Sequence, residues 1–118
     1  MPIQTRYLFS AAMDVESGKE ALFNEVYDRE HVPLIQTVPG VIATARFTRE
    51  ELTMIIGGER KTIVIEGEPR YNALYELESP DVLTSDAWAK AVDQGRWPGE
   101  VRPFTKNRRH VLYRRIVP

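Results

Sequence analysis

A tyrosine and an aspartate precede a histidine at helical spacing in the segment NEVYDREHVPLIQTVPGV, residues 24–41. Imidazole has an unperturbed pKa near neutral pH, so His31 can both accept and donate protons there. In a helix, Tyr27 and Asp28 lie one turn earlier, where either side chain could orient the imidazole. His31 could therefore be a general acid/base assisted by Tyr27 or Asp28. The alternative is a histidine at a helix end, stabilised by the negative end of the helix dipole.

An arginine and several aromatic residues could complete such a site. Arg46 lies in a strand-like stretch, and its guanidinium could bind a carboxylate or an enolate. The alternative for Arg46 is an ion pair with an acidic neighbour. Aromatic side chains could line a cavity for a planar or cyclic substrate, although core packing is their more common role. The aromatic candidates are Tyr7, Phe9, Tyr75 and Trp97.

The composition narrows the classes of function. The 118 residues are enough for one domain, residues 1–118, with a stable core. The 16 basic and 17 acidic residues give a net charge of -1, which provides no general attraction to nucleic acid or to an anionic membrane. The chain has no cysteine, which excludes disulfides and thiol nucleophiles and fits a reducing cytoplasm.

The sequence also lacks the usual signals for membranes and cofactors. No apolar run has the length of a transmembrane helix, and the N-terminus does not have the pattern of a signal peptide. His31 and His110 are far apart, with no spacing typical of a metal site. Either could in principle bind a haem iron, but no other feature supports a haem. We expect a cytoplasmic protein that binds a small organic substrate, with no metal, cofactor, nucleic acid or membrane partner.

Residues 96–115 are strongly basic and contain one acid, Glu100. The basic residues are Arg96, Arg102, Lys106, Arg108, Arg109, Arg114 and Arg115. Aromatic residues do not alternate with them in a pattern for base stacking. We expect a solvated edge, or pairing with the acidic first helix across a dimer.

The first half of the chain reads as strand, helix and strand. Residues 3–13 alternate between apolar and polar, as in a half-buried strand. Residues 19–31 have apolar residues four apart, as in an amphipathic helix, with Asp14 or Ser17 as its cap. Pro33 should end or kink this helix, with one further turn to about residue 36. Residues 41–49 alternate again, with Val41, Ala43, Ala45 and Phe47 on one face and Arg46 on the other.

The second half repeats this order after an insertion. Residues 50–68 contain two β-branched runs around Gly57-Gly58, which predict a hairpin. A strand follows at 71–78, then a helix within 78–95, a loop at 96–107 and a last strand at 109–117.

This order predicts an α+β fold of the ferredoxin-like βαββαβ type. The fold has a four-stranded antiparallel sheet with two helices on one face, and the 50–68 hairpin is an addition to it. Two helices can cover only one face of such a sheet. The other face carries apolar residues that are unfavourable in water, which suggests a homodimer packed through the sheets.

The same segments resemble the dimeric α/β-barrel superfamily. The resemblance rests on RYLFSAAM, on the pattern Y-x-x-E-H-V-P followed by V-P-G-V and an A-R-F strand, and on YNALYELESPDVLTSDAW. Within the superfamily, the chain is most similar to the EthD-like and the small polyketide-cyclase or muconolactone-isomerase-type branches. The resemblance covers nearly the whole chain except the insertion.

The resemblance implies a homodimer in which each protomer has a pocket between its sheet and its helices. It also implies that His31, near the end of the first helix, is a general acid or base. Some isomerases of this type also use a cysteine, which this chain lacks.

Together these features predict a cofactor-independent isomerase, cyclase, dehydratase or lyase that acts on a small hydrophobic or cyclic carbonyl compound. Two alternatives remain. One is a non-catalytic small-molecule-binding or stress-related dimer, and the other is a cofactor-free monooxygenase of the same fold.

Overall fold

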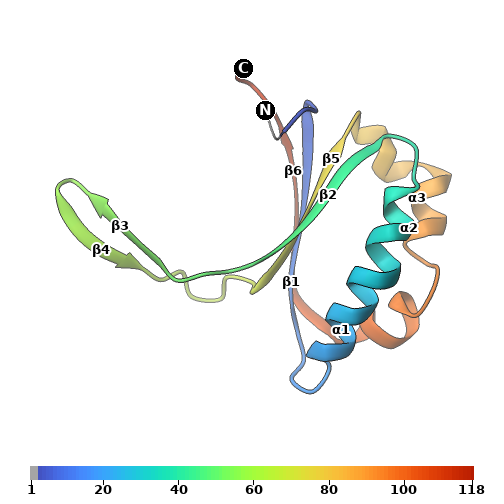
Figure 1. The fold of residues 1–118 in the computed structure, drawn as a ribbon, viewed down its shortest axis with the longest axis horizontal. Helices are drawn as coiled ribbons and strands as arrows, with labels where there is room; N and C mark the ends of the chain where they lie inside the picture. The colour runs from blue at the N-terminus through green and yellow to red at the C-terminus, as the bar shows by residue number, and fades with distance from the viewer. Residues whose placement is uncertain (1–2) are drawn as a thin grey trace.

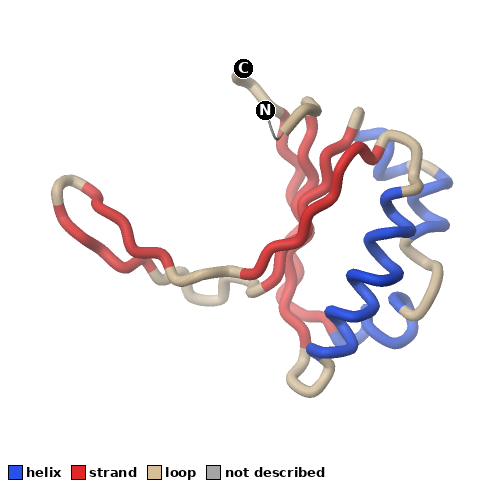
Figure 2. Tube along the Cα trace, viewed as in Figure 1, coloured by secondary structure: helices blue, strands red, loops and turns tan. Residues whose placement is uncertain are grey.

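Helices cover one face of a four-stranded antiparallel sheet (Figures 1 and 2). The computed structural model describes residues 3–118. The sheet has the order β2-β5-β1-β6, formed by β1 Tyr7–Val15, β2 Val41–Thr48, β5 Tyr71–Leu77 and β6 Thr105–Arg114. All neighbouring strands are antiparallel. When the inserted strands β3 and β4 are set aside, this is the split βαβ order, so the predicted ferredoxin-like fold is confirmed.

Residues 20–36 form one continuous helical segment. Its parts are α1 Glu20–Val26, a π-helical turn Tyr27–His31 and α2 Val32–Gln36. Pro33 does not end the helix, and the further turn expected to about residue 36 is confirmed by α2, which ends at Gln36. In the wider π turn, the Val32 N–H donates to the Tyr27 carbonyl, five residues earlier. Pro33 then lies in the first turn of α2, where a residue without an N–H is tolerated.

Two local predictions about the ends of elements are corrected by tertiary contacts. Neither Asp14 nor Ser17 caps α1, because Lys19 takes the capping position without a side-chain hydrogen bond. Asp14 accepts the Arg70 N–H at 2.8 Å, next to the start of β5. The expected strand 3–13 is shifted to Tyr7–Val15 by its pairing with β5 and β6.

The second helical region is divided into short turns. A 3-10 turn, Pro80–Thr84, precedes α3 Asp86–Ala91, and the Ser85 hydroxyl accepts the Trp88 N–H to cap α3. The predicted loop 96–107 contains two further turns, Trp97–Val101 and Arg102–Phe104, and β6 begins at Thr105. These turns form because Trp97 and Val101 are buried in the core.

A β-bulge in β2 changes which residues share a face. The register with β5 shifts between Val41 and Ala43, so one extra residue stands between them. Val41 is therefore buried with the core on the helical side, whereas Phe47 is exposed on the opposite face. The predicted single face containing both residues is wrong, because strict alternation fails at a bulge.

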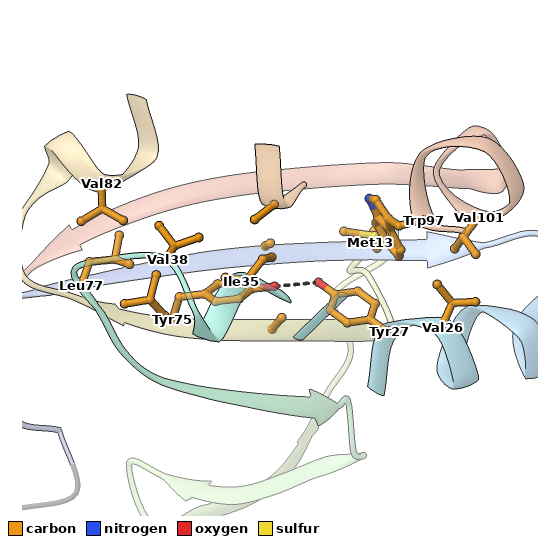
Figure 3. Packing of buried hydrophobic residues seen from close by; sticks show 14 of the residues in the cluster. Met13, Val26, Tyr27, Ile35, Val38, Tyr75, Leu77, Val82, Trp97 and Val101 are labelled. Atoms are coloured by element: carbon orange, nitrogen blue, oxygen red, sulfur yellow. Dashed lines mark hydrogen bonds between the residues drawn. The ribbon is translucent and has the colours of Figure 1, made fainter. Parts of the chain in front are cut away.

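The core lies between the sheet and the helices. Figure 3 shows side chains of β1 and β5 packed against those of the first helix and of the turn that follows residue 96. The largest fully buried side chains are Tyr75, Phe23, Ile35, Leu77, Val26 and Val101. In the described part of the chain, no helix is long and apolar enough to cross a membrane.

Gly40 is a position where the fold requires glycine. Its φ is +94°, and a Cβ placed there would lie 2.4 Å from Val82 Cγ2. We expect Gly40→Ala to lower the free energy of unfolding by about 2–4 kcal/mol, from left-handed backbone strain and steric overlap. Gly18→Ala is the matched control, since Gly18 has φ +87° and open space around it. Urea unfolding should show a loss of only about 1 kcal/mol for this control. Equal losses would contradict the steric argument.

The inserted hairpin projects away from the body. Strands β3 Leu52–Ile56 and β4 Glu59–Ile63 form a separate two-stranded sheet, as the predicted insertion requires. Figure 1 shows this hairpin on the side of the main sheet opposite the helices. It extends the molecule to 50 Å, and the radius of gyration is 15.9 Å. A compact chain of this length would have a value of about 13.5 Å.

Candidate functional site

A cavity of about 380 Å³ lies between the sheet and the helices. This volume is within the range of small-molecule sites. Strands β1, β5 and β6, the first helix and the turns after residue 80 all contribute to it. The lining residues are Phe9, Ala11, Met13, Tyr27, His31, Ile35, Tyr75, Leu83, Trp88, Val92, Trp97, Arg102, Arg108 and His110. Aromatic rings therefore form much of the wall.

His31 lines this cavity at the last position of the π turn. Its side chain is 5% exposed, and its Nδ1 is buried without a hydrogen-bond partner among the described residues. Burial lowers the pKa of His31 to about 4, and the positive charges of Arg102 and Arg46 add to this effect. The imidazole is therefore neutral at pH 7.

Trp97 and Tyr27 hold the imidazole in place. The indole ring of Trp97 stacks on His31 with ring centroids 4.1 Å apart, and Tyr27 meets the imidazole edge-on at 5.1 Å. Glu30 fixes the turn that carries Trp97, because its carboxylate accepts the Arg96 N–H at 2.9 Å and Nε at 2.6 Å. These hydrogen bonds lower the pKa of Glu30.

Two tyrosine hydroxyls meet inside the cavity. Tyr27 and Tyr75 point toward each other in Figure 3, with their hydroxyl oxygens 3.2 Å apart. Burial raises the pKa of both phenols, so both remain protonated at pH 7. One hydroxyl donates to the other, which leaves one proton free to donate to a ligand.

Asp28 and Arg46 lie together outside the cavity. The Arg46 Nη1 is 2.6 Å from Asp28 Oδ1, and Nη2 donates to Asn24 Oδ1 at 3.0 Å. Asp28 therefore does not orient His31 here. The Arg46 guanidinium also lies over the Tyr27 ring, 4.2 Å from its centroid, so it packs behind the cavity wall.

The aromatic candidates divide into two groups. Phe9, Tyr75 and Trp97 line the cavity with His31 and Tyr27. Tyr7 packs partly buried against the core and does not line the cavity. The structure therefore brings together predicted residues from two strands and two helical segments that are distant in the sequence.

Sequence reasoning missed the polar residues Arg102, Arg108 and His110 in the cavity lining. Two of them, Arg108 and His110, lie two positions apart in β6. They were missed because the last strand was expected to begin at residue 109 rather than at Thr105. A strand begun earlier would have placed both on one face.

The basic C-terminal region has several separate roles. Arg96 binds the acidic first helix within the same chain, with its Nε 2.6 Å from Glu30 Oε2 and its Nη1 3.5 Å from Glu25 Oε2. Arg109 binds Glu68, and Arg102 binds Asp93. The expected pairing with the acidic helix therefore takes place within one protomer.

Comparisons with known proteins support the fold. No family model matches the sequence, and no curated protein matches it. A mutant of MhuD with two manganese protoporphyrin IX molecules bound per active site matches with a TM-score of 0.61 and 14% identity, covering 95% of this chain and 96% of that chain. The haem-degrader MhuD from Mycobacterium tuberculosis, with two haems in its active site, has a TM-score of 0.56 and 18% identity, covering 95% and 97%.

An ethyl tert-butyl ether D (EthD) family protein from Bacillus halodurans is also similar. It has a TM-score of 0.55 and 12% identity, covering 93% of this chain and 99% of that chain. This chain has the same ferredoxin-like α+β fold. The predicted resemblance is thus confirmed for the fold, whereas identities this low do not carry an activity.

Proposed function

We propose that the protein is an acid/base enzyme that uses His31 on a small cyclic carbonyl compound. The observation that carries the proposal is the neutral imidazole in the cavity, whose Nδ1 has no partner. A buried polar atom left without a hydrogen bond costs about 1–3 kcal/mol. Such a cost is tolerated most often where the group serves a function.

The cavity residues supply the parts needed for enolisation. The neutral His31 takes a proton from the carbon next to the substrate carbonyl. The C–H electron pair becomes the C=C bond of an enolate, and the negative charge moves to the oxygen. The free hydroxyl proton of the Tyr27–Tyr75 pair stabilises that oxygen. Return of the proton to another carbon gives an isomerase, and loss of a leaving group gives a lyase or dehydratase.

The charges of the lining favour a substrate with an acidic group. Arg102 and Arg108 are the charged residues of the lining, and no carboxylate is among the described lining residues. Arg102 is partly engaged, because it donates to Asp93 and to the Val92 carbonyl. Arg108 Nε donates to Thr105 Oγ1 at 3.1 Å, which leaves its terminal nitrogens for a ligand carboxylate.

Haem is bound in the MhuD structures, so its fit to this cavity bears on the proposal. A haem iron takes an axial ligand such as imidazole. His31 is closed in by Trp97 on one ring face and by Tyr27 at its edge. The imidazole of His110 is stacked on Phe9. No haem step is proposed.

We also propose that the protein is a homodimer formed through the open face of the sheet. That face exposes large apolar side chains, with Phe47 52%, Val111 40% and Tyr113 54% exposed. A second sheet packed against it would remove these side chains from water. The cavity lies on the other side of the sheet, so each protomer would keep its own site.

Deuterium exchange at a carbonyl α-carbon tests the proposed activity without knowledge of the natural substrate. The probe is 4-oxocyclohexane-1-carboxylate, with its methyl ester as the neutral comparison. We expect the protein to accelerate exchange in D₂O at neutral pH, measured by proton NMR. Arg108→Gln should raise the KM for the acid at least about fivefold and leave the KM for the ester nearly unchanged, because one charge-assisted contact is lost.

Arg114→Gln is the matched control, because Arg114 lies on the same strand but does not line the cavity. Binding of the probe without exchange would contradict the enzyme and favour the non-catalytic binding dimer. Oxygen consumption with a phenolic compound would favour a cofactor-free monooxygenase instead.

A further inference from the structure

The projecting hairpin, residues 50–68, has one predominantly apolar face that its own protomer does not cover; we name this hairpin the arm. In an antiparallel pair, directly opposite residues share a face, and here Leu52 faces Ile63 and Met54 faces Lys61. One face therefore carries Leu52, Met54, Ile56 and Ile63, with two charged residues, Lys61 opposite Met54 in the middle and Glu59 at the outer end. The other face carries Thr53, Ile55, Arg60 and Thr62.

Strands β3 and β4 of the arm are poorly stabilised by their own protomer, which binds the arm at its base, where Arg109 contacts Glu68. These strands pair only with each other, and a two-stranded hairpin alone is at best marginally stable in water. Yet Leu52, Met54 and Ile56 are between 43% and 48% exposed. At its base, a hollow of about 470 Å³ is lined by the apolar residues Leu52, Ile63, Val64 and Ile65 and by the charged residues Arg49, Glu50, Glu51 and Glu68. Such a surface is typical of a segment that packs against another molecule.

The direction in which the arm projects indicates which molecule it packs against. Figure 1 shows the arm leaving the sheet on the side opposite the helices, which is the side of the uncovered sheet face. Stacked sheets lie about 10 Å apart. The nine residues from Arg49 to Gly57, eight steps along the chain, span about 26 Å when extended. A second copy on the open face would therefore lie beside the arm, and the arm would extend past its sheet.

The area of the open sheet face also favours a second copy of this chain as the molecule that the arm contacts. Four strands of 7 to 10 residues give a flat footprint on the order of 550 Å². Specific interfaces bury about 800 Å² on each partner. The arm adds a footprint of about 250 Å², from its 26 Å length and the width of two strands. The sheet face and the arm together approach the area that a stable dimer needs.

We propose that the arm clasps a second copy of this chain, with the face of Leu52, Met54 and Ile56 against the partner. This inference rests on the sheet-to-sheet dimer of the proposed function and adds a second contact region to it. The two-fold symmetry of such a dimer makes the contact reciprocal, so each protomer both gives and receives an arm.

Sedimentation equilibrium of arm variants tests the inference. The first variant carries Met54→Glu and Ile56→Glu on the apolar face. The matched control carries Thr53→Glu and Ile55→Glu on the other face, so it adds the same charge to the same strand. We expect the first pair to raise the dimer dissociation constant at least about tenfold, and the control pair to raise it less than about threefold.

If the glutamate substitutions disturb the fold of the hairpin, a variant without the arm provides a second test. The Arg49 N–H donates to the Arg70 carbonyl at 2.7 Å, so the segment that enters the arm and the segment that leaves it are already paired at its base. Replacing residues 50–69 by Asn-Gly should close β2 and β5 with a two-residue turn. Circular dichroism then checks the folded state, and we expect this variant to dissociate at least as readily as the first.

The outcomes separate the arm from the proposed dimer. If all variants dimerise as tightly as the natural chain, or if both glutamate pairs weaken the dimer equally, the arm contact is overturned and the sheet dimer stands. If the natural chain is monomeric at high concentration, both proposals are overturned. A loss of dimer confined to the apolar-face and arm-free variants supports the clasp.

Discussion

Replacing His31 by alanine is expected to lower the rate of deuterium exchange at the probe's α-carbon by at least about 100-fold. General base catalysis by a positioned side chain contributes on the order of 10²–10⁴ in rate. His31 lies with the Tyr27–Tyr75 hydroxyl pair in the cavity wall, whereas the other imidazole of the described lining, His110, is stacked on Phe9. The measurement is the NMR exchange rate at pH 7 under saturating probe.

The pH profile distinguishes a base from a merely structural histidine. Because the pKa of His31 is about 4, nearly all His31 side chains are already in the active neutral form well below pH 7. The kcat/KM of the natural chain should therefore rise through about pH 4 and remain level from pH 6 to 8. His110→Gln is the control, since His110 lines the cavity but stacks on Phe9 rather than on Trp97. Exchange that survives His31→Ala at the natural rate, in a folded protein, would refute the role of His31.

Acid should destabilise the protein through the same imidazole. The pKa of His31 is near 6.5 in the unfolded chain and about 4 in the folded one, so the unfolded chain binds the proton first as the pH falls. The stability contribution of the neutral imidazole is complete above about pH 6.5 and is lost as the pH falls through 4. Between pH 7 and pH 4.5 this linkage removes about 2 kcal/mol of unfolding free energy.

His31→Leu isolates this contribution. Leucine has no titrating group and no unpaired nitrogen, so the variant should lose about 2 kcal/mol less than the natural chain over the same pH interval. Urea unfolding at pH 7 and pH 4.5 measures both chains, and the other titrating groups, His110 among them, are present in each. Identical pH dependence in the two chains would show that His31 is not held neutral by burial.

Sequence patterns predicted the fold because the sheet and the helices have different periods. Alternation in residues 3–13 and 71–78 indicated strands, and apolar residues four apart in 19–31 indicated a helix. These patterns reflect which side of each element faces the core, which the sequence encodes directly. The order of the elements then left the split βαβ arrangement as the natural solution.

Local irregularities were not predictable from the same patterns. The π turn at Tyr27–His31 and the bulge at Val41/Ala43 each insert one residue into a regular element. A periodicity argument assumes regular elements, so it placed Val41 and Phe47 on one face and expected Pro33 to end or kink the helix. Both irregularities persist because surrounding contacts compensate for their local cost.

The elements, their order, the apolar open face of the sheet and a histidine at the end of the first helix could all be predicted from the amino-acid sequence. The stacking of Trp97 on His31, the ion pair of Asp28 with Arg46, and the place of Arg102 and Arg108 in the cavity lining became apparent only from the folded chain. The difference arises from separation along the chain. Periodicity and capping arise from neighbours within a few residues, whereas the cavity is built from contacts between residues up to about a hundred positions apart.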